Sequence, residues 1–278
     1  MNGLGVNYGG LDEPIPTPSP SPTTSPVSSP APSSSSSRRP STHKAQRPRT
    51  IYFRFGSRIV GATGSPADIA HPNVLRLSTI PTIVDTIIHF LLWILPSVLS
   101  SRILSSHPEW ALPRRFIFKK QKEYWESEFE LEKAAYEMLK PLQGHFIPIC
   151  FGQIDYDDTR ALLLSDIGGA CLATPEGAVL RHDELQPLLE ETLTALVNAG
   201  VSHDDLKLDN FHLVEDDRGG DRIMAVDLER VDIGLSEKQG GFAVKCAVDF
   251  LMQAYKAHLA CLENDGLLQP KRYPSKKN

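Results

Sequence analysis

The 278-residue sequence predicts an α+β protein preceded by a disordered N-terminal tail. Two segments, 123–139 and 184–199, repeat apolar residues at helical spacing. Several shorter apolar segments have the length of strands, at residues 115–118, 145–152, 160–164, 211–214 and 223–226. Residues 1–48 are dominated by Pro, Ser and Thr, a composition that buries too little apolar area to offset the entropy of an ordered chain.

Residues 49–114 are expected to form an irregular N-terminal extension. Within it, Gly61 and Gly64 belong to a short segment that is similar to a glycine-rich phosphate loop, although an ordinary turn is the preferred explanation. Residues 83–104 form an apolar helix in this prediction, with a mean hydropathy near the threshold for a membrane span. Asp85 would be costly in lipid. A transmembrane helix, a helix that is buried or lies at an interface, and an insertion all remain open.

Charge and cysteine content narrow the classes of function. The formal net charge of −5 argues against nonspecific nucleic-acid binding. The cysteines lack metal-ligand spacing, which favours reduced thiols in an intracellular protein; they are Cys150, Cys171, Cys246 and Cys261. The N-terminus has no basic-then-apolar secretory pattern. We therefore expect a cytoplasmic protein, with a membrane tether through residues 83–104 as the alternative.

The most informative stretch is His203–Asn210, followed by a predicted hairpin that ends at Asp227. Phosphoryl transfer needs positioning and charge neutralisation more than covalent work by the protein. Asp205 suits the group that accepts the hydroxyl proton, and Lys207 suits the cation near the transferred phosphate. Asn210 and Asp227 offer the oxygen ligands that magnesium prefers. A polar surface turn is the simpler alternative, but the order of loop, hairpin and carboxylate favours a phosphoryl-transfer site.

The spacing of this stretch resembles the kinase catalytic loop H-R-D-L-x-x-x-N, with Asp204 in place of the arginine. Asp227 stands where the D-F-G aspartate would stand, with Leu-Glu in place of Phe-Gly. The chain thus resembles the protein-kinase-like superfamily, especially its atypical, fungal-type and aminoglycoside-phosphotransferase-like members, over about residues 115–227. The resemblance implies an abbreviated bilobal protein-kinase-like fold, with a small lobe at about 115–165 and a large lobe at about 170–268.

The resemblance also implies a nucleotide site, in which a strand lysine paired with a helix glutamate holds the phosphates. Lys119 directly follows an apolar strand and is preferred to Lys120. Glu132 falls on the apolar face of the predicted helix, where a carboxylate needs a partner, and is preferred to Glu128. The segment that contains Asp166 resembles the hinge, whose backbone binds adenine.

The implied activity is transfer of a phosphoryl group from ATP, with magnesium, to a hydroxyl of a protein or a small molecule. The alternative is a pseudokinase that binds nucleotide or protein without catalysis. Three features favour the alternative: the sparse glycines, the missing Phe-Gly, and a region after Asp227 that lacks an A-P-E motif. In that region one amphipathic helix is expected after Gly240 and Gly241.

Overall fold

The structure is a computed structural model that describes residues 48–67, 71–110, 112–216, 219–234 and 237–269. Except for Pro48, the predicted tail at residues 1–48 lies outside the described residues, as does the basic C-terminal end at residues 271–277. The described chain combines helices with antiparallel sheets, which confirms the predicted mixture of α and β structure.

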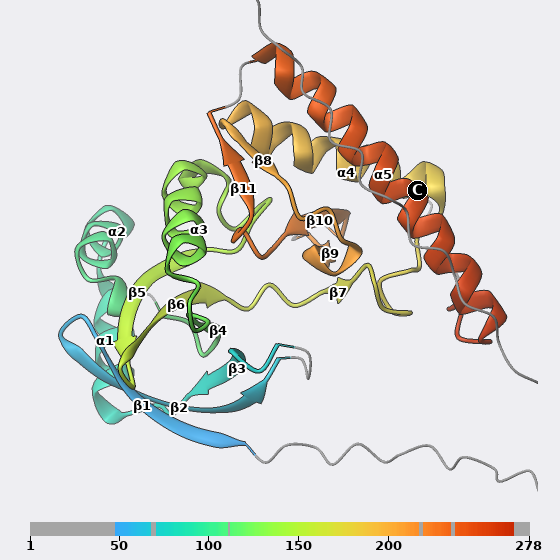
Figure 1. Cartoon of the computed structure of the whole chain (residues 1–278). Coiled ribbons are helices and arrows are strands. Elements are labelled where there is room, and N and C mark those ends of the chain that lie inside the picture. Colours follow the sequence, from blue (N-terminus) through green and yellow to red (C-terminus); the bar gives the residue numbers. More distant parts are fainter. Residues whose placement is uncertain (1–47, 68–70, 111, 217–218, 235–236, 270–278) are drawn as a thin grey trace, which may run out of the picture. The chain divides into compact units, whose positions relative to one another are not determined.

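One sheet of six antiparallel strands organises the first half of the described chain (Figure 1). Its order is β1–β2–β3–β4–β6–β5, and helix α3 (Glu126–Met138) connects β4 to β5 in the sequence. The strands are β1 (Arg49–Phe55), β2 (Arg58–Pro66), β3 (Val74–Thr79), β4 (Arg115–Lys120), β5 (Cys150–Tyr156) and β6 (Thr159–Ser165). The predicted strand at 145–152 begins only at Cys150, because Pro148 cannot donate a ladder hydrogen bond.

Residues 49–114 do not form the irregular extension that we expected, because they supply three strands of this sheet. In β1 the buried residues are Ile51, Phe53 and Phe55, and exposed residues alternate with them. This period of two places one side of the strand in the core and the other in water. The same pattern continues at Val60 and Ala62 of β2, which are also buried.

The two glycines of the suspected phosphate loop lie inside strand β2 instead of in a turn. A Cβ on Gly64 would stand 1.9 Å from the carbonyl oxygen of Arg76 in β3. A Cβ on Gly61 would stand 2.9 Å from the ring of Tyr52 in β1. Close packing of β2 against its two neighbours therefore accounts for both glycines.

The predicted helix at 83–104 is two helices, α1 (Ile83–Ile94) and α2 (Ser97–Ser106). Pro96 separates them, since proline lacks the N–H that a continuous helix would need at this position. A capping box starts α1: the Thr82 hydroxyl accepts from the Asp85 N–H at 3.3 Å, and the Asp85 carboxylate accepts from the Thr82 N–H at 2.8 Å. None of the helices in the described part of the chain has the length and apolar character needed to span a bilayer.

Two buried carboxylates attach the residues between β3 and β4 to the β1–β2 turn. Asp85 forms an ion pair with Arg58 at 2.5 Å. Glu109, in the short helix η1 (Pro108–Trp110), accepts hydrogen bonds from the Ser57 N–H at 3.3 Å and the Ser57 hydroxyl at 2.7 Å. Gly56 adopts φ 57°, and a Cβ there would stand 2.6 Å from the Glu109 carboxylate. The residues between β3 and β4 are therefore attached to the sheet.

The second half of the described chain is mainly helical. Helix α5 (Glu237–Asn264) packs along α4 (His182–Asn198), as Figure 1 shows. A small sheet has the order β10–β9–β7, and a separate pair joins β8 to β11. These strands are β7 (Ala170–Cys171), β8 (Val201–His203), β9 (Phe211–Glu215), β10 (Asp221–Ala225) and β11 (Val231–Ile233). The predicted hairpin at 211–226 is confirmed by the pairing of β9 with β10.

The sequence predicts that the last helix begins after Gly240 and Gly241, but α5 includes both glycines. A Cβ on Gly240 would stand 2.3 Å from a methyl group of Val197 in α4. The glycine therefore permits close contact between the two helices. Helical residues of α4 and α5 join α3, β6 and the small strands in one apolar core, whereas Phe53, Phe116 and Phe118 belong to a second core on the other side of the large sheet.

The close contact at Gly64 leads to a stability prediction. Gly64→Ala forces a methyl group into the β2–β3 backbone pairing and should lower the free energy of unfolding by about 1–3 kcal/mol. Gly241→Ala is the matched control, because nothing lies within 4 Å of its added Cβ in helix α5, and it should raise stability by about 0.5–1 kcal/mol. Denaturant unfolding measures both, and equal stabilities for Gly64→Ala and the unsubstituted protein would contradict the prediction.

Candidate functional site

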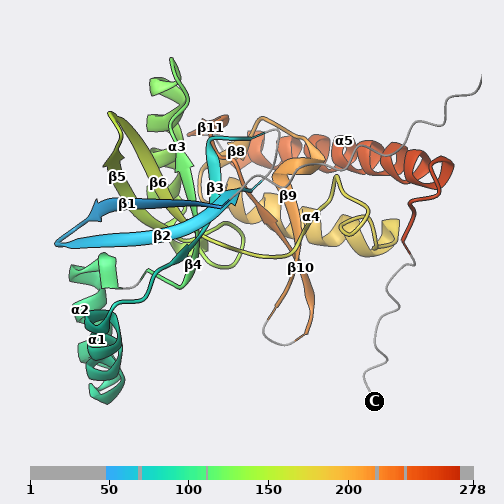
Figure 2. The same ribbon diagram turned by 90° about the horizontal axis from the view of Figure 1, so that it is seen from below.

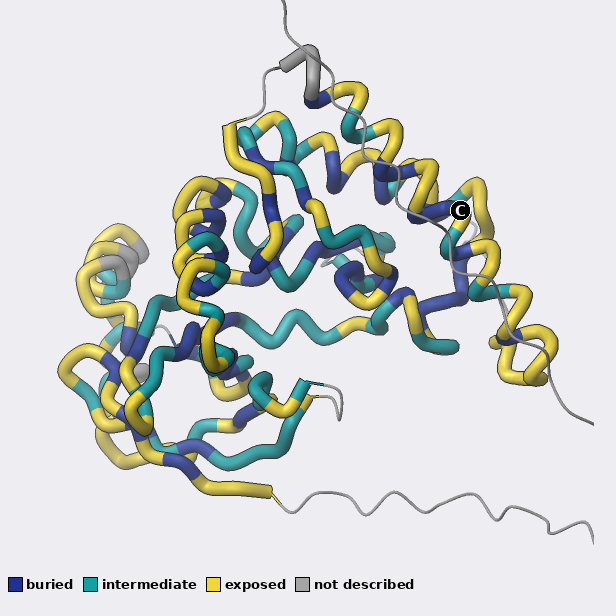
Figure 3. The backbone as a smooth tube through the Cα atoms, viewed as in Figure 1, coloured by how far each residue is buried: buried dark blue, intermediate teal, exposed yellow. Residues whose placement is uncertain are grey.

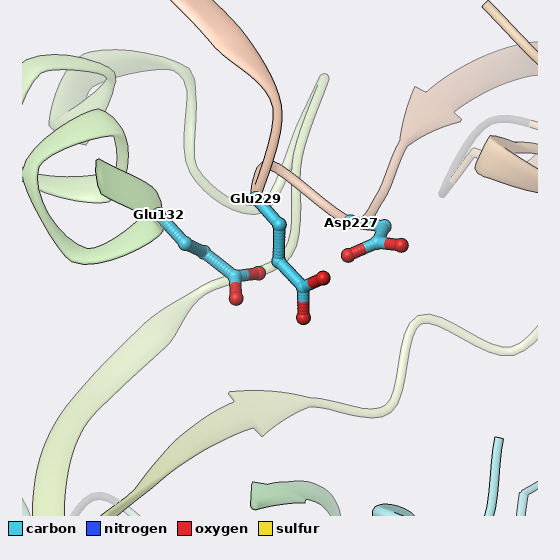
Figure 4. A group of neighbouring side chains, drawn as sticks. All are labelled: Glu132, Asp227 and Glu229. Carbon is cyan, nitrogen blue, oxygen red and sulfur yellow. The ribbon is translucent and has the colours of Figure 1, made fainter. Parts of the chain in front are cut away.

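The centre of the candidate site is the buried ammonium group of Lys119 on β4. Its Nζ lies 2.8 Å from Glu132, 2.6 Å from Asp227 and 3.0 Å from Glu229. Figure 4 shows the three carboxylates gathered from α3 and from the segment after β10. We call these four residues the Lys119 cluster. The predicted contact between Lys119 and Glu132 is thus present, whereas Lys120 lies 3.6 Å from the exposed Asp157.

Local sequence explains why Lys119 and Glu132 meet. Phe116 and Phe118 are buried in the core on one side of β4, so Ile117 and Lys119 point to the other side, toward α3. Helix α3 buries Glu132 together with its apolar residues. Glu128, the alternative in the sequence, is only partly buried and accepts a hydrogen bond from Ser127.

Asp227 enters the cluster through an uncommon backbone conformation. Its φ of 58° is in the left-handed region, which few residues other than glycine adopt. The preceding residue, Val226, donates its N–H to the Asn210 carbonyl at 2.9 Å, and its own carbonyl lies 3.0 Å from His203 Nε2. These contacts fix the chain where it turns, so the Asp227 carboxylate faces Lys119.

Glu229 is the residue that sequence reasoning missed, because it was treated only as a departure from the D-F-G motif. It is buried, and its second oxygen lies 2.6 Å from Lys122 Nζ. Lys122 in turn lies 4.4 Å from the centre of the Trp125 ring. The signal in the sequence was an apolar residue, Leu228, between two carboxylates. In the structure Leu228 is fully buried, and both flanking carboxylates contact Lys119.

A backbone hydrogen bond joins the polar loop Asp205–Asn210 to the segment that carries Asp227. The Asp205 carboxylate accepts from Lys207 at 2.9 Å and from the Asn210 side chain at 3.2 Å. The same Asn210 nitrogen donates to the Asp205 carbonyl at 2.8 Å. Since this nitrogen faces Asp205, a cation would bind Asn210 through its carboxamide oxygen. The Val226–Asn210 hydrogen bond connects the polar loop to Asp227.

Asp166 has a different set of contacts. Its carboxylate binds Arg115 of β4 at 2.9 Å and Arg76 of β3 at 3.4 Å, and it is almost completely buried. The side chain therefore ties the segment after β6 to the large sheet. The predicted adenine contact concerned the backbone of this segment and stays a prediction.

Burial and charge shift the pKa values of the cluster in opposite directions. Burial raises the pKa of Glu132, and the attraction of Lys119 offsets this only in part. Burial also acts to raise the pKa of Asp227, but the charge and hydrogen bond of Lys119 outweigh it and lower that pKa. For Lys119, burial acts to lower the pKa, but the carboxylates of Glu132, Asp227 and Glu229 outweigh it and raise the pKa. Lys119 is therefore charged at neutral pH.

The cluster contains the oxygen atoms that a hard divalent cation requires. One carboxylate oxygen each of Glu132, Asp227 and Glu229 lies within 4.8 Å of the others. Their accessibility differs, because 29% of the Asp227 side chain is exposed but only 1% of the Glu132 side chain. Asp227 binds Lys119 through Oδ1, so its Oδ2 is the oxygen that suits a cation arriving from solvent.

The lowered pKa of Asp227 predicts a difference in acid stability. A carboxylate whose folded pKa lies below its unfolded value, about 3.9, contributes stability above that pH and loses it as the pH falls through the folded pKa. Between about pH 5 and pH 2, the unsubstituted protein should therefore lose more free energy of unfolding than Asp227→Asn. Asparagine tolerates the left-handed backbone, so the substitution mainly removes the charge.

The control for this comparison is Asp158→Asn. Asp158 has the same backbone conformation, φ 57°, on an exposed turn. Its pH profile of unfolding should follow that of the unsubstituted protein. Identical profiles for Asp227→Asn and the unsubstituted protein would contradict the ion-pair interpretation.

Comparison with known proteins does not identify a family for this chain. No model of a protein family matches it, and no curated protein matches its sequence. The function is therefore inferred from the residues of the site.

Proposed function

We propose that this chain is an ATP- and magnesium-dependent phosphotransferase with an abbreviated, bilobal, protein-kinase-like fold. In this proposal the large sheet with α3 is the small lobe, and the part built on α4 and α5 is the large lobe. The observation that carries the proposal is the convergence of four separate stretches of sequence. Lys119 and Glu132 form a buried ion pair, Asp227 contacts that lysine, and Val226 ties Asp227 to Asn210.

Lys119 and Glu132 have the arrangement that binds nucleotide phosphates in kinases, a strand lysine oriented by a helix glutamate. The buried Glu132 limits the positions available to the ammonium group. We assign Lys119 to the phosphates and Glu132 to the positioning of Lys119. The adenine contact of the Asp166 segment belongs to the same proposal.

Asp227 and Asn210 are the proposed ligands of magnesium, which would neutralise the charge of the phosphates. Asp227 has the most exposed carboxylate of the Lys119 cluster, and the Asn210 carboxamide nitrogen already donates to Asp205. The two ligands come from segments that a backbone hydrogen bond holds together. In this arrangement the Asp227 carboxylate and the Asn210 carboxamide oxygen would bind the same magnesium ion.

Asp205 is the proposed acceptor of the proton from the acceptor hydroxyl. Burial acts to raise its pKa, but hydrogen bonds from Lys207 and Asn210 outweigh it and lower the pKa, so the carboxylate is ionised at neutral pH. Lys207 is exposed and would neutralise charge on the transferred phosphoryl group. The acceptor is a hydroxyl of a protein or a small molecule.

A second candidate function is a nucleotide- or protein-binding module without catalysis, and Glu229 favours it. This carboxylate occupies the place of the glycine in D-F-G and contacts Lys119 at 3.0 Å. Three carboxylates around one ammonium group oppose the approach of phosphates by like-charge repulsion. Lys122 relieves part of this charge through its 2.6 Å contact with Glu229.

The first test is stabilisation by nucleotide. Mg-ATP at a hundredfold excess over Kd should add about 2.7 kcal/mol of stability, or roughly 5–10 °C in melting temperature for a domain of this size. The shift should require magnesium, should largely disappear in Asp227→Ala and should weaken in Lys119→Ala. Lys120→Ala is the matched control and should retain it. Equal shifts with and without magnesium, unchanged in Asp227→Ala, would exclude the proposed metal site.

The second test is turnover. Asp205→Asn preserves the shape of the side chain but removes the proton acceptor, so phosphoryl transfer should fall by a factor of about 10² or more. Mg-ATP affinity should change little, because Asp205 is assigned to the acceptor. Full activity of Asp205→Asn would refute this role. Magnesium-dependent ATP binding without turnover in the unsubstituted protein, over a panel of protein and small-molecule acceptors, would support the second candidate.

A further inference from the structure

Glu229 differs from the other carboxylates of the Lys119 cluster, because it contacts a second lysine. One of its oxygens lies 3.0 Å from Lys119 Nζ, and the other lies 2.6 Å from Lys122 Nζ. In the part of the chain that the structure describes, Glu132 and Asp227 form ion pairs with Lys119 alone. Figure 4 shows Glu229 between these two carboxylates. Glu229 is therefore the carboxylate that can leave Lys119 and still keep a cation as its partner.

The backbone around Glu229 is held on both sides. Leu228 before it is fully buried, and the Arg230 carbonyl after it accepts a hydrogen bond from the Asp204 N–H at 3.1 Å. The chain then enters β11, which pairs with β8 and lies beside α3 in Figure 2. Figure 3 shows buried positions along α3 and just before β11. A change of partner by Glu229 therefore needs only a rotation of its side chain.

Lys122 is held beside Glu229 by the turn that precedes α3. The Trp125 N–H donates to the Lys122 carbonyl at 3.2 Å, which closes this turn. The Lys122 ammonium group lies 4.4 Å from the centre of the Trp125 ring, within the range of a cation–π contact. Arg230 lies 5.8 Å from the same ring, so a second cation occupies the space near it. These contacts keep the Lys122 ammonium group where Glu229 meets it.

The other acidic residues near Lys122 do not replace Glu229 as its partner. Among the described residues, Glu229 is the one carboxylate in ion-pair contact with Lys122. Glu128 has a lowered pKa, but the main cause is the hydrogen bond from the neighbouring serine, and the charge of Lys122 contributes less. Glu123 and Glu126 are exposed on the same turn, where water weakens their attraction for a cation. Lys122 is therefore available to hold Glu229.

The phosphates of a nucleotide would meet carboxylates of like charge around Lys119. In the proposed function Asp227 binds magnesium, and Glu132 keeps Lys119 in position. Glu229 has neither role, and only 10% of its side chain is exposed. If it left Lys119 without another partner, it would become an unpaired buried charge, which is costly. Lys122 lowers this cost, because it stays bound to Glu229.

We propose that Lys122 is a positioning residue of the nucleotide site, which holds Glu229 away from Lys119 when the phosphates of Mg-ATP arrive. This inference rests on the proposed phosphotransferase function, since it assigns Lys119 to the phosphates. Without nucleotide, Glu229 bridges the two lysines and restrains Lys119. With nucleotide, Glu229 is bound to Lys122 alone. The contact between Glu229 and Lys119 is then an inhibitory contact that the nucleotide itself releases.

The experiment is calorimetric titration of the full chain and its variants with Mg-ATP. Lys122→Met should weaken binding by roughly tenfold, because Glu229 would then keep Lys119 as its only partner. Adding Glu229→Gln to Lys122→Met should restore most of the affinity, since the neutral side chain no longer opposes the phosphates. Lys122→Arg keeps the positive charge and should bind Mg-ATP like the unsubstituted chain.

Lys120→Met is the matched control. Lys120 also contacts a carboxylate and an aromatic ring, at 3.6 Å from Asp157 and 5.8 Å from the centre of the Tyr156 ring. Its removal should leave the affinity for Mg-ATP unchanged. Melting temperatures without nucleotide check that each variant is folded. Glu229→Gln alone gives a second measure that does not depend on Lys122→Met, and it should bind Mg-ATP at least as tightly as the unsubstituted chain.

The outcomes separate this inference from the proposed function. If the unsubstituted chain binds Mg-ATP, the inference is overturned by unchanged affinity in Lys122→Met, by a loss that Glu229→Gln fails to restore, or by weaker binding in Glu229→Gln alone. Binding by Glu229→Gln but not by the unsubstituted chain would support the inhibitory contact. Absence of binding in both would overturn the proposed function and this inference with it.

Discussion

The arrangement of the candidate site depends on one constraint, the neutralisation of a buried ammonium group. Lys119 lies on a strand with apolar core on both sides, where an uncompensated charge would be very costly. Three carboxylates from two other parts of the chain surround it. Their position in turn requires α3 to pack on the sheet and the chain after β10 to adopt the left-handed conformation of Asp227. This cation therefore joins the two halves of the described chain at the site, beside the apolar core that the halves share.

The same physical rule fixes the segment between β3 and β4. Asp85 and Glu109 are buried, and each has partners in the β1–β2 turn. Ion pairs and hydrogen bonds of this kind specify geometry more than they add stability, because desolvation offsets much of the attraction. Here they orient α1 so that its charged residue faces the sheet and most of its large apolar side chains are exposed.

Glu229 connects the two proposed functions. An extra carboxylate beside Lys119 can restrain the lysine before nucleotide arrives, or it can exclude nucleotide altogether. Its partner Lys122 draws one oxygen of Glu229 away from the centre of the cluster. The balance between these two cations decides how much negative charge an incoming phosphate would meet.

The sequence by itself determined the mixture of helices and strands, the β9–β10 hairpin, the pairing of Lys119 with Glu132 and the compact polar loop at Asp205. The helices, the strands and the hairpin follow from local periodicity, and Glu132 needs a partner because it is a carboxylate on an apolar face. The choice of Lys119 as that partner, and the roles expected for the loop at Asp205, came from the resemblance to kinases. Only the tertiary structure decided that residues 49–79 complete the sheet, that Gly64 serves close strand packing, and that Glu229 joins the cluster. These outcomes depend on contacts between distant segments, and a pattern of neighbouring residues carries no information about which distant backbone or charge will be met in space.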